Sequence, residues 1–411
     1  MSRPEPTDPP APSFWPVAAA VAVAVHLVAC LVSYGGLLSD SRPGDTVHYR
    51  EFATKILDHG LVPYRDFYVE FPPGALPAFV APDALGVDHY FLLFKVLMAA
   101  SGALTLVLAS RSLAALGATR RRYLSLAPFA LLPLLLGHVY LNRYDAVSAV
   151  LLVATLLLLL LGRDSSACAA LGLAVAAKLL PAVALPIAGI RIFRERGRRA
   201  MLRALAAFTA VLLAAFLPFT AIAPGGVEFS LRSQAERHLQ LESIGASALL
   251  GLDRVGLYDS HWILGAPGSL DLGGALPDTV GALSSVAQLA AIALVAVLYW
   301  RGPEVAERLV TAFAAAVTVI VLGKVLSPQY LTMLTAVVPL AGGRSGRRAT
   351  ALLIVALILS QGLSTWGGYH DLRNAGSSVF VLVIRNGCLV ALFALLVMSL
   401  HRSRIQNQTT A

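Results

Sequence analysis

The sequence predicts an all-α protein that crosses a lipid bilayer repeatedly, with about twelve transmembrane or re-entrant helices and two long outer loops. Its residues are 57% hydrophobic and only 13% charged, whereas a soluble domain carries about 25% charged residues. Apolar runs such as 146–161 approach the roughly 20 residues needed to cross the hydrocarbon core. The net charge is +9, but the arginines gather in short clusters between these runs, which argues against a nucleic acid as the partner.

The first predicted span is 15–34, which is too long for the core of a signal peptide and is expected to be retained. The residues before it, 1–14, are polar and rich in proline, and they are predicted to be disordered. The other segments that we expect to span the membrane are 90–110, 123–139, 145–162, 201–222, 279–300, 308–323, 329–342, 350–366 and 377–400.

Segment 167–190 is long enough for one span, but Lys178 and Pro181 interrupt it. Basic residues in short loops stay cytoplasmic, and the arginine clusters share one side only if 167–190 enters and leaves on one face. We therefore predict two short helices broken near Pro181, because proline removes a backbone donor. The clusters that enter this argument are 120–122, 191–199, 344–348 and 402–404.

This topology places both chain ends in the cytoplasm and the two long loops, 35–89 and 223–278, on the outer side. The predicted organisation is a cytoplasmic tail over 1–14, a membrane domain over 15–400 and a second cytoplasmic tail over 401–411. The predicted location is the plasma (inner) membrane. Loops of this length usually fold and carry function.

In the first outer loop, residues 46–59 have helical spacing, and Gly60 is expected to end the helix. Asp45 occupies the position of an N-cap. One interpretation is that it only caps this helix; the other is that its carboxylate takes a proton from a hydroxyl group near the membrane surface. Glu70 follows in the segment YVEFPPG, where the prolines predict an extended path and then a turn; its role stays open.

Two lysines lie close to apolar segments. A lysine such as Lys178 costs a few kcal/mol in the membrane unless it faces a cavity or a partner, so it either marks a functional site or extends to the interface. Lys324 stands before Ser327 and Pro328, which are expected to open the next helix. It either anchors a helix end or contributes to a positive pocket that attracts phosphate.

The second outer loop crowds polar side chains into a short stretch, namely Arg237, His238, Gln240 and Glu242. One interpretation is an amphipathic surface helix in which Leu239 and Leu241 enter the lipid. The other is a binding surface on which Arg237 holds a phosphate through two hydrogen bonds.

Candidate bases and phosphate-binding cations thus lie on the outer side, and the chain has no P-loop, Rossmann fingerprint or metalloprotease motif. Nucleotide donors are cytoplasmic. A transferase that works on the outer side needs a donor that reaches it through the membrane, and a lipid-linked phosphate meets that requirement.

Ordered motifs over about residues 40–345 support this hypothesis by resemblance. They are Gly44-Asp45 with Tyr49, Pro63-Tyr64-Arg65-Asp66-Phe67, Glu70-Phe71-Pro72-Pro73, Leu141-Asn142-Arg143-Tyr144-Asp145, Ala177-Lys178-Leu179-Leu180-Pro181, Arg237 to Ser243, and Lys324 to Tyr330. In these motifs the chain resembles the GT-C superfamily of membrane glycosyltransferases. More narrowly, it is similar to glycosyltransferase family 87, the polyprenyl-phosphate-mannose-dependent α-1,2-mannosyltransferases of actinobacteria.

The resemblance implies transfer of a sugar, typically mannose, from a polyprenyl phosphate to a glycolipid or glycan hydroxyl, with inversion at the anomeric carbon. The partners are then that donor, that acceptor and membrane lipids. The essential acid of the first outer loop corresponds to Asp45. The residue two positions on is Val47, so a DxD pair is absent, and we predict no metal and no cofactor. The residues predicted to bind donor or acceptor are His48, Tyr49, Glu70, Lys178, Arg237, His238, Glu242, Lys324, Gln329 and Tyr330.

Two other functions stay open. A secondary transporter or lipid flippase would use Lys178 and the broken segment 167–190, but it predicts charges along a path through the bilayer rather than in outer loops. A non-catalytic partner in an envelope assembly complex would need no base, so Asp45→Asn would leave the cell envelope unchanged.

Overall fold

The structure is a computed structural model, and it describes residues 14–34, 44–265, 269–365, 371–372 and 376–408. Helices account for 80% of it, which confirms the all-α membrane fold. The predicted tail 1–14, apart from Phe14, lies outside the described residues, as does 35–43 at the start of the first outer loop.

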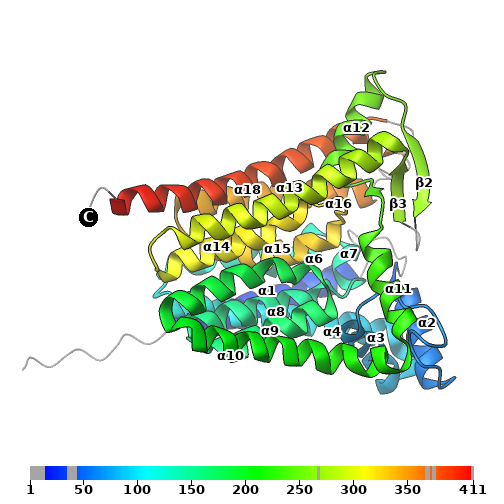
Figure 1. Cartoon of the computed structure of the whole chain (residues 1–411), viewed down its shortest axis with the longest axis horizontal. Coiled ribbons are helices and arrows are strands. Elements are labelled where there is room, and N and C mark those ends of the chain that lie inside the picture. The colour runs from blue at the N-terminus through cyan, green and yellow to red at the C-terminus, as the bar shows by residue number, and fades with distance from the viewer. Residues whose placement is uncertain (1–13, 35–43, 266–268, 366–370, 373–375, 409–411) are drawn as a thin grey trace, which may run out of the picture.

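Six helices among the described residues are long and apolar enough to cross a membrane. They are α1 (Trp15–Tyr34), α4 (Tyr90–Ala115), α10 (Leu185–Ile222), α13 (Ala275–Trp300), α16 (Gly343–Thr365) and α18 (Ser378–Gln408). Figure 1 shows them lying side by side along one axis. The chain is therefore a multi-pass membrane protein, but this length criterion does not support the predicted count of about twelve spans.

Several predicted spans are shorter or broken in the structure. Segment 123–139 forms short helical turns instead of one helix, because new turns begin at Pro128 and Pro133 and Gly137 has a positive φ of 60°. The shorter helices inside the bundle are α5 (Ala127–Ala130), α6 (Leu132–Leu135), α7 (His138–Leu141), α8 (Asp145–Leu160), α9 (Asp164–Ala177), α14 (Ala306–Thr318) and α15 (Leu331–Val337). Short 3₁₀ helices adjoin them in the chain, namely η3 (Arg120–Leu126), η4 (Leu180–Ala184), η5 (Val319–Leu322), η6 (Pro328–Tyr330) and η7 (Val338–Leu340).

The bundle has two chemically different ends. At one end, which we call the arginine end, the start of α1 packs against η3, and Arg122 of η3 pairs with Glu307 of α14. The next residue, Arg308, donates to the carbonyl of Leu400 near the end of α18, at 2.7 Å. Figure 1 shows the end of α18 on the left and the elements of both outer loops on the right, at what we call the loop end. The first and the last spans therefore have their terminal ends on the same side.

The break in 167–190, predicted near Pro181, begins a few residues earlier at Lys178, which is extended (φ −156°, ψ 128°) and follows α9, whereas Pro181 lies in η4. Asp164, at the start of α9, lies 3.2 Å from Arg196 in α10. The segment therefore enters and leaves at the arginine end, as predicted. Beyond Arg196, Gly197 has φ 76° and divides α10, so the second part of α10 can cross to the loop end.

The first outer loop contains the predicted helix as α2 (Thr46–Leu57), and Gly60 follows it with a left-handed φ of 63°. The other elements of the loop end are η1 (Pro73–Ala75), α3 (Leu76–Leu85), η2 (Val87–His89), α11 (Pro224–Ala235) and α12 (Ile244–Arg254). Tyr68 and Ser233, whose hydroxyls are 3.1 Å apart, join the first loop to α11 in the second.

A small antiparallel sheet in the second outer loop departs from the all-α prediction. It consists of β1 (Leu239–Gln240), β2 (His261–Gly265) and β3 (Ser269–Gly273), with β3 in the centre. The surface-helix interpretation of this stretch was wrong, because Leu239 and Leu241 are each only 1% exposed and pack in a separate apolar core. Their alternation with polar residues has the two-residue period of a strand.

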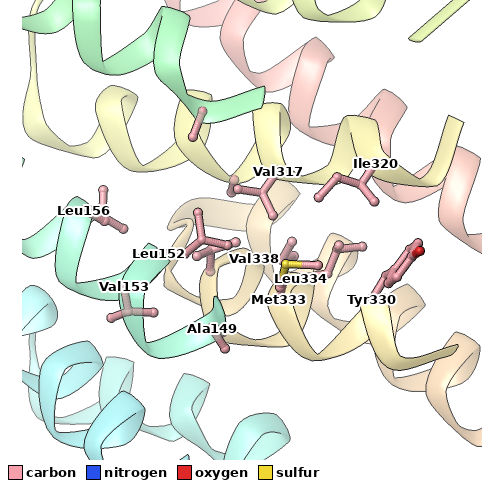
Figure 2. Packing of buried hydrophobic residues seen from close by; sticks show 14 of the residues in the cluster. Ala149, Leu152, Val153, Leu156, Val317, Ile320, Tyr330, Met333, Leu334 and Val338 are labelled. Carbon is pink, nitrogen blue, oxygen red and sulfur yellow. The ribbon is translucent and has the colours of Figure 1, made fainter. Parts of the chain in front are cut away.

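The main core lies between the short helices. Figure 2 shows Leu152 and Leu156 of α8 beside Val317 of α14, with Met333 and Leu334 of α15 close by. All five side chains are essentially inaccessible. In a membrane such contacts stabilise through close packing more than through exclusion of water. This core supports the helix ends that carry the charged residues described next.

Candidate active site

A cavity of about 730 Å³ opens at the loop end of the bundle. Seven ionisable side chains of the kinds used in acid–base chemistry and anion binding line it, namely Asp45, Glu70, Glu242, Arg143, Lys178, Arg237 and Lys324. Tyr49, Gln329 and Tyr330 also line it. The structure thus brings together nine residues that the sequence singled out from both outer loops and from two inter-helical segments.

Asp45 stands at the start of α2 in helical conformation (φ −69°, ψ −11°), but its side chain makes no capping hydrogen bond. Its backbone carbonyl accepts from the amide of Tyr49 at 3.1 Å. The carboxylate pairs with Arg143 instead, and both side chains are partly exposed to the cavity. The capping interpretation is therefore not what this geometry shows.

Glu70 is carried by an extended segment that the prolines hold open; Pro72 has φ −61° and ψ 153°. Gly74 then packs against the backbone of α9, where an added Cβ would lie 2.5 Å from the carbonyl carbon of Ala176. From the other side, Gln234 of α11 donates to the Glu70 carbonyl at 3.0 Å. The segment is thereby fixed between the end of α9 and the second outer loop.

Burial raises the pKa of the Glu70 carboxyl to about 7, and the positive charges of Arg237 and Lys178 oppose this shift without cancelling it. A carboxyl group with this pKa exchanges a proton near neutral pH. That property is what a general acid or base requires.

Lys178 lies at the base of the cavity and donates to Asp145 at 2.6 Å. Both side chains are buried, with 11% and 2% exposed. The ammonium group also lies over the rings of Tyr144 (4.9 Å) and Tyr330 (4.7 Å). Lys178 therefore both lines a cavity and has a charged partner, the two conditions under which a lysine is expected in an apolar segment.

Helix ends favour this ion pair. Lys178 follows the C-terminus of α9, and Asp145 is the first residue of α8. The helix macrodipole stabilises a cation at a C-terminus and an anion at an N-terminus. Two antiparallel helices thus present opposite charges side by side.

Arg237 and Lys324 line the side of the cavity formed by the second outer loop. The buried Nε of Arg237 has no hydrogen-bond partner among the described residues. Lys324 donates to the carbonyl of Ala235 at 2.8 Å, and burial lowers the pKa of its ammonium group. Its own carbonyl accepts from the amide of Gln240 in β1 at 2.9 Å.

Glu242 is held from the last span. Arg385 of α18 is fully buried and donates to Glu242 at 2.6 Å. The next residue, Asn386, donates to the carbonyl of Glu242 at 3.2 Å and to the hydroxyl of Ser247 at 2.9 Å. Glu242 is therefore held by α18, which lies far along the chain from its own loop.

The remaining predicted residues divide into two groups. Tyr49 is 1% exposed and stacks on Phe79 with ring centres 4.2 Å apart, so it is also part of an aromatic core. His48 and His238 are exposed, do not line the cavity, and contact Glu51 at 3.9 Å and Asp278 at 3.2 Å. The structure thus separates both histidines from the site residues. Gln329 lines the cavity and accepts from the hydroxyl of Ser327 at 2.5 Å.

Three charged residues of this region were not among the predicted site residues: Arg143, Asp145 and Arg385. Two of them have a sequence signal. Asp145 and Arg385 fall inside predicted spans, where an ionisable residue is a functional candidate with a partner to be found. Arg143 lies between two predicted spans, so this signal does not apply to it, although it stands in the motif Leu141-Asn142-Arg143-Tyr144-Asp145.

The arrangement offers carboxylates beside cations in a cavity of the size that holds small ligands, which is about 300–1,000 Å³. Within the part of the chain that the structure describes, no group of three or more His, Cys, Asp and Glu side chains is placed to hold a metal ion. The positive charges that face the cavity come from arginine and lysine side chains. Such a site can take a proton from a hydroxyl group and hold a phosphate.

A comparison with known families agrees with this chemistry. The model described as "Glycosyltransferase family 87" matches residues 68–328, which is more than half of the chain. The match includes Glu70, Lys178 and Lys324, whereas Asp45 and Arg385 lie outside it. No curated protein matches the chain.

Proposed function

The chain belongs to glycosyltransferase family 87, and from this premise we propose that it transfers a sugar from a polyprenyl phosphate to a hydroxyl group of a glycolipid or glycan. Mannose is the sugar that we propose. The family itself shows a membrane glycosyltransferase; the donor, the acceptor and the sugar are our proposals.

The observation that carries the proposal is the composition of the cavity. Four cations (Arg143, Lys178, Arg237 and Lys324) and three carboxylates (Asp45, Glu70 and Glu242) line one volume at the end of a membrane bundle. A phosphate-linked donor needs cations, and an acceptor hydroxyl needs a base. A donor with a long isoprenoid chain also needs a site beside the membrane, where apolar helices can accept that chain.

In the proposed reaction, Asp45 accepts the proton of the acceptor hydroxyl while that oxygen forms a bond to the anomeric carbon. The bond between this carbon and the phosphate oxygen breaks, and polyprenyl phosphate leaves with the electron pair. Lys178, Arg237 and Lys324 are placed to stabilise the charge that grows on the phosphate. The ion pair with Arg143 holds Asp45 at the rim of the cavity. Attack from the side opposite the leaving group inverts the anomeric configuration.

We further propose that the loop end faces the outer side of the plasma membrane and that both termini are cytoplasmic. The support is the gathering of arginines at the opposite end, since basic residues stay cytoplasmic. Counting the short apolar helices packed among the six spans, we propose about twelve membrane segments in all.

The test is sugar transfer by Asp45→Asn in membranes that are supplied with a labelled polyprenyl-phosphate sugar. Asp66→Asn is the matched control, because Asp66 lies in the same loop but pairs with Arg65 at the surface, at 2.8 Å, outside the cavity. We expect a loss of about 100-fold or more for Asp45→Asn, the range for removing a general base, and little change for the control.

Full transfer by Asp45→Asn would exclude Asp45 as the base. In that case Glu70, whose pKa of about 7 suits proton exchange, becomes the next candidate. Movement of the intact donor lipid without transfer, measured in proteoliposomes, would support the transporter hypothesis instead.

A further inference from the structure

A second cavity, of about 980 Å³, lies at the arginine end and has no part in the proposed transfer. Elements from four regions of the chain surround it: η3, the start of α14, the start of α16 and the end of α18. Its lining contains four arginines and one glutamate, which are Arg121, Arg122, Arg308, Arg347 and Glu307. The cavity therefore carries an excess of positive charge.

This charge is only partly neutralised within the protein. Arg122 is committed to Glu307 and to the carbonyl of Leu340, at 2.9 Å. Arg121 and Arg347 are exposed, and within the described part of the chain neither makes an ion pair. Two guanidinium groups thus border the cavity with their hydrogen-bonding capacity directed at solvent or a ligand.

The wall of the cavity is closely packed. Gly342 packs so tightly on the Arg122–Glu307 pair that an added Cβ would lie 2.9 Å from a Glu307 carboxylate oxygen. Ser125 also lines the cavity, and its buried hydroxyl has no hydrogen-bond partner among the described residues.

The level of the cavity in the membrane points to the source of this anion. The apolar stretch of α16 begins at Gly343 and that of α18 ends at Arg402, so both stretches end beside this cavity. Trp15 and Trp300, at the arginine ends of α1 and α13, have the position of aromatic residues at a membrane interface. Exposed apolar side chains of the lining, such as Leu124 at 71% exposed, adjoin the arginines.

We propose that this cavity binds the phosphate headgroup of an anionic membrane lipid, with Arg121 and Arg347 as its principal contacts. Guanidinium groups bind phosphate oxygens through paired hydrogen bonds. The adjacent apolar wall accommodates the first part of an acyl chain. A lipid held here joins η3, α14, α16 and α18, and so stabilises the packing of the last two spans against the first half of the bundle.

The experiment measures binding of phosphatidylglycerol to the purified full chain in neutral detergent, with phosphatidylcholine and inorganic phosphate as comparison probes. The test variant is Arg121→Gln/Arg347→Gln. The matched control is Arg198→Gln/Arg199→Gln, which removes the same charge from exposed positions of the same end that line neither cavity.

We expect the wild type and the control to prefer phosphatidylglycerol, and the test variant to bind it about thirtyfold more weakly, given about 1 kcal/mol for each arginine near a membrane surface. The charge-retaining variant Arg121→Lys/Arg347→Lys keeps most of the binding. All four residues are exposed, so the melting temperatures of the lipid-free variants should match.

Two results would overturn the proposal. Equal losses in the test and control variants would show that surface charge alone attracts the lipid. Inorganic phosphate that binds as tightly as phosphatidylglycerol, and displaces it, would show a site for a free anion instead of a lipid.

Discussion

The buried pair of Lys178 and Asp145 allows a quantitative test of how the base of the cavity is built. The perturbations are the single variants Lys178→Met and Asp145→Asn and the double variant that combines them. Each single variant leaves one charge buried without its partner, whereas the double variant removes both charges and keeps the volumes similar.

The structure sets the magnitude. Breaking a buried ion pair by removing one partner costs about 3–5 kcal/mol. Each remaining charge keeps a second favourable contact: Lys178 keeps the rings of Tyr144 and Tyr330, and Asp145 keeps the N-terminus of α8. We therefore expect the lower end of that range, about 3 kcal/mol for each single variant.

The double variant should be less destabilised than either single variant. One carboxylate oxygen of Asp145 is buried and has no hydrogen-bond partner among the described residues. The contacts of the wild-type pair therefore offset only part of the desolvation free energy of its two charges. Replacing such a pair by uncharged side chains of similar volume is often neutral or stabilising. We expect a cost of at most about 1 kcal/mol, close to the cost of a volume-conserving substitution in a core.

The assay is equilibrium unfolding in mixed micelles, followed by circular dichroism as the denaturing detergent fraction rises. The matched control is the pair Lys55–Glu51, with a similar separation of 2.7 Å but with 32% and 52% of its side chains exposed. Exposed pairs contribute about 0.2–1 kcal/mol, so the same cycle at Lys55 and Glu51 should show only a small coupling.

The reasoning is refuted if Lys178→Met is as stable as the wild type, or if the costs of the two single variants simply add in the double variant. Either result would mean that the pair is not electrostatically coupled. A large coupling at the exposed control pair would instead show that the assay reports surface charge.

Three further predictions concern other parts of the molecule. The pKa of Glu70 is about 7 in the folded protein and has an ordinary value of 4.5, so Glu70 ionises first in the unfolded chain, and the free energy of unfolding falls as pH rises from about 4.5 to about 7. Between about pH 5.5 and about pH 8 this loss amounts to about 2 kcal/mol. Glu70→Gln should abolish it, whereas the exposed control Glu51→Gln should not. Unfolding curves of both variants at the two pH values check this, and parallel curves for Glu70→Gln and wild type would contradict it. Arg385→Met should cost about 3 kcal/mol, because it breaks the buried ion pair with Glu242. A thermal melt as high as that of the exposed control Arg402→Gln would count against it. Gly74→Ala should displace the segment that carries Glu70, because the added Cβ would lie 2.5 Å from the backbone of α9. Sugar transfer by the folded variant should then fall at least tenfold. Unchanged transfer would show that this contact does not position Glu70.

The parts of the fold that the sequence predicted well are those with a strong local signal. The α2 helix has an apolar face with helical spacing, and Gly60 ends it with a left-handed φ. The break at Lys178 followed from a charge and a proline within an apolar run. Each feature is encoded within a few residues, so no tertiary information was needed.

The features that the sequence did not predict depend on contacts between distant residues. Nothing near Glu242 indicates that Arg385, on the last span, is its partner. Likewise, Asp45 precedes α2 and Arg143 lies between α7 and α8, so they meet only in the folded chain. Helix length alone does not support the predicted count of spans for a related reason, since short apolar helices satisfy their polar groups inside a bundle and need not cross the bilayer as single rods.

The strand at Leu239–Gln240 shows a different limit. The stretch contains enough apolar and polar residues to fit a helical or an alternating pattern. Its alternation was the correct signal, but the deciding factor is β3, which pairs Leu239 with Leu272. A two-residue strand has no stability without its neighbours, so its conformation is a property of the folded loop.

The link between Arg385 and Glu242 has a consequence for how the protein is made. Because α18 is synthesised after every other element that lines the cavity, a nascent chain that still lacks residue 385 has neither the ion pair of Arg385 with Glu242 nor the contact of Asn386 with Ser247. The cavity can then reach its final shape only after α18 has been made and inserted. A newly inserted chain would therefore stay inactive in the membrane until α18 has been added, and truncation before residue 385 would abolish activity although every residue matched by the family model is still present.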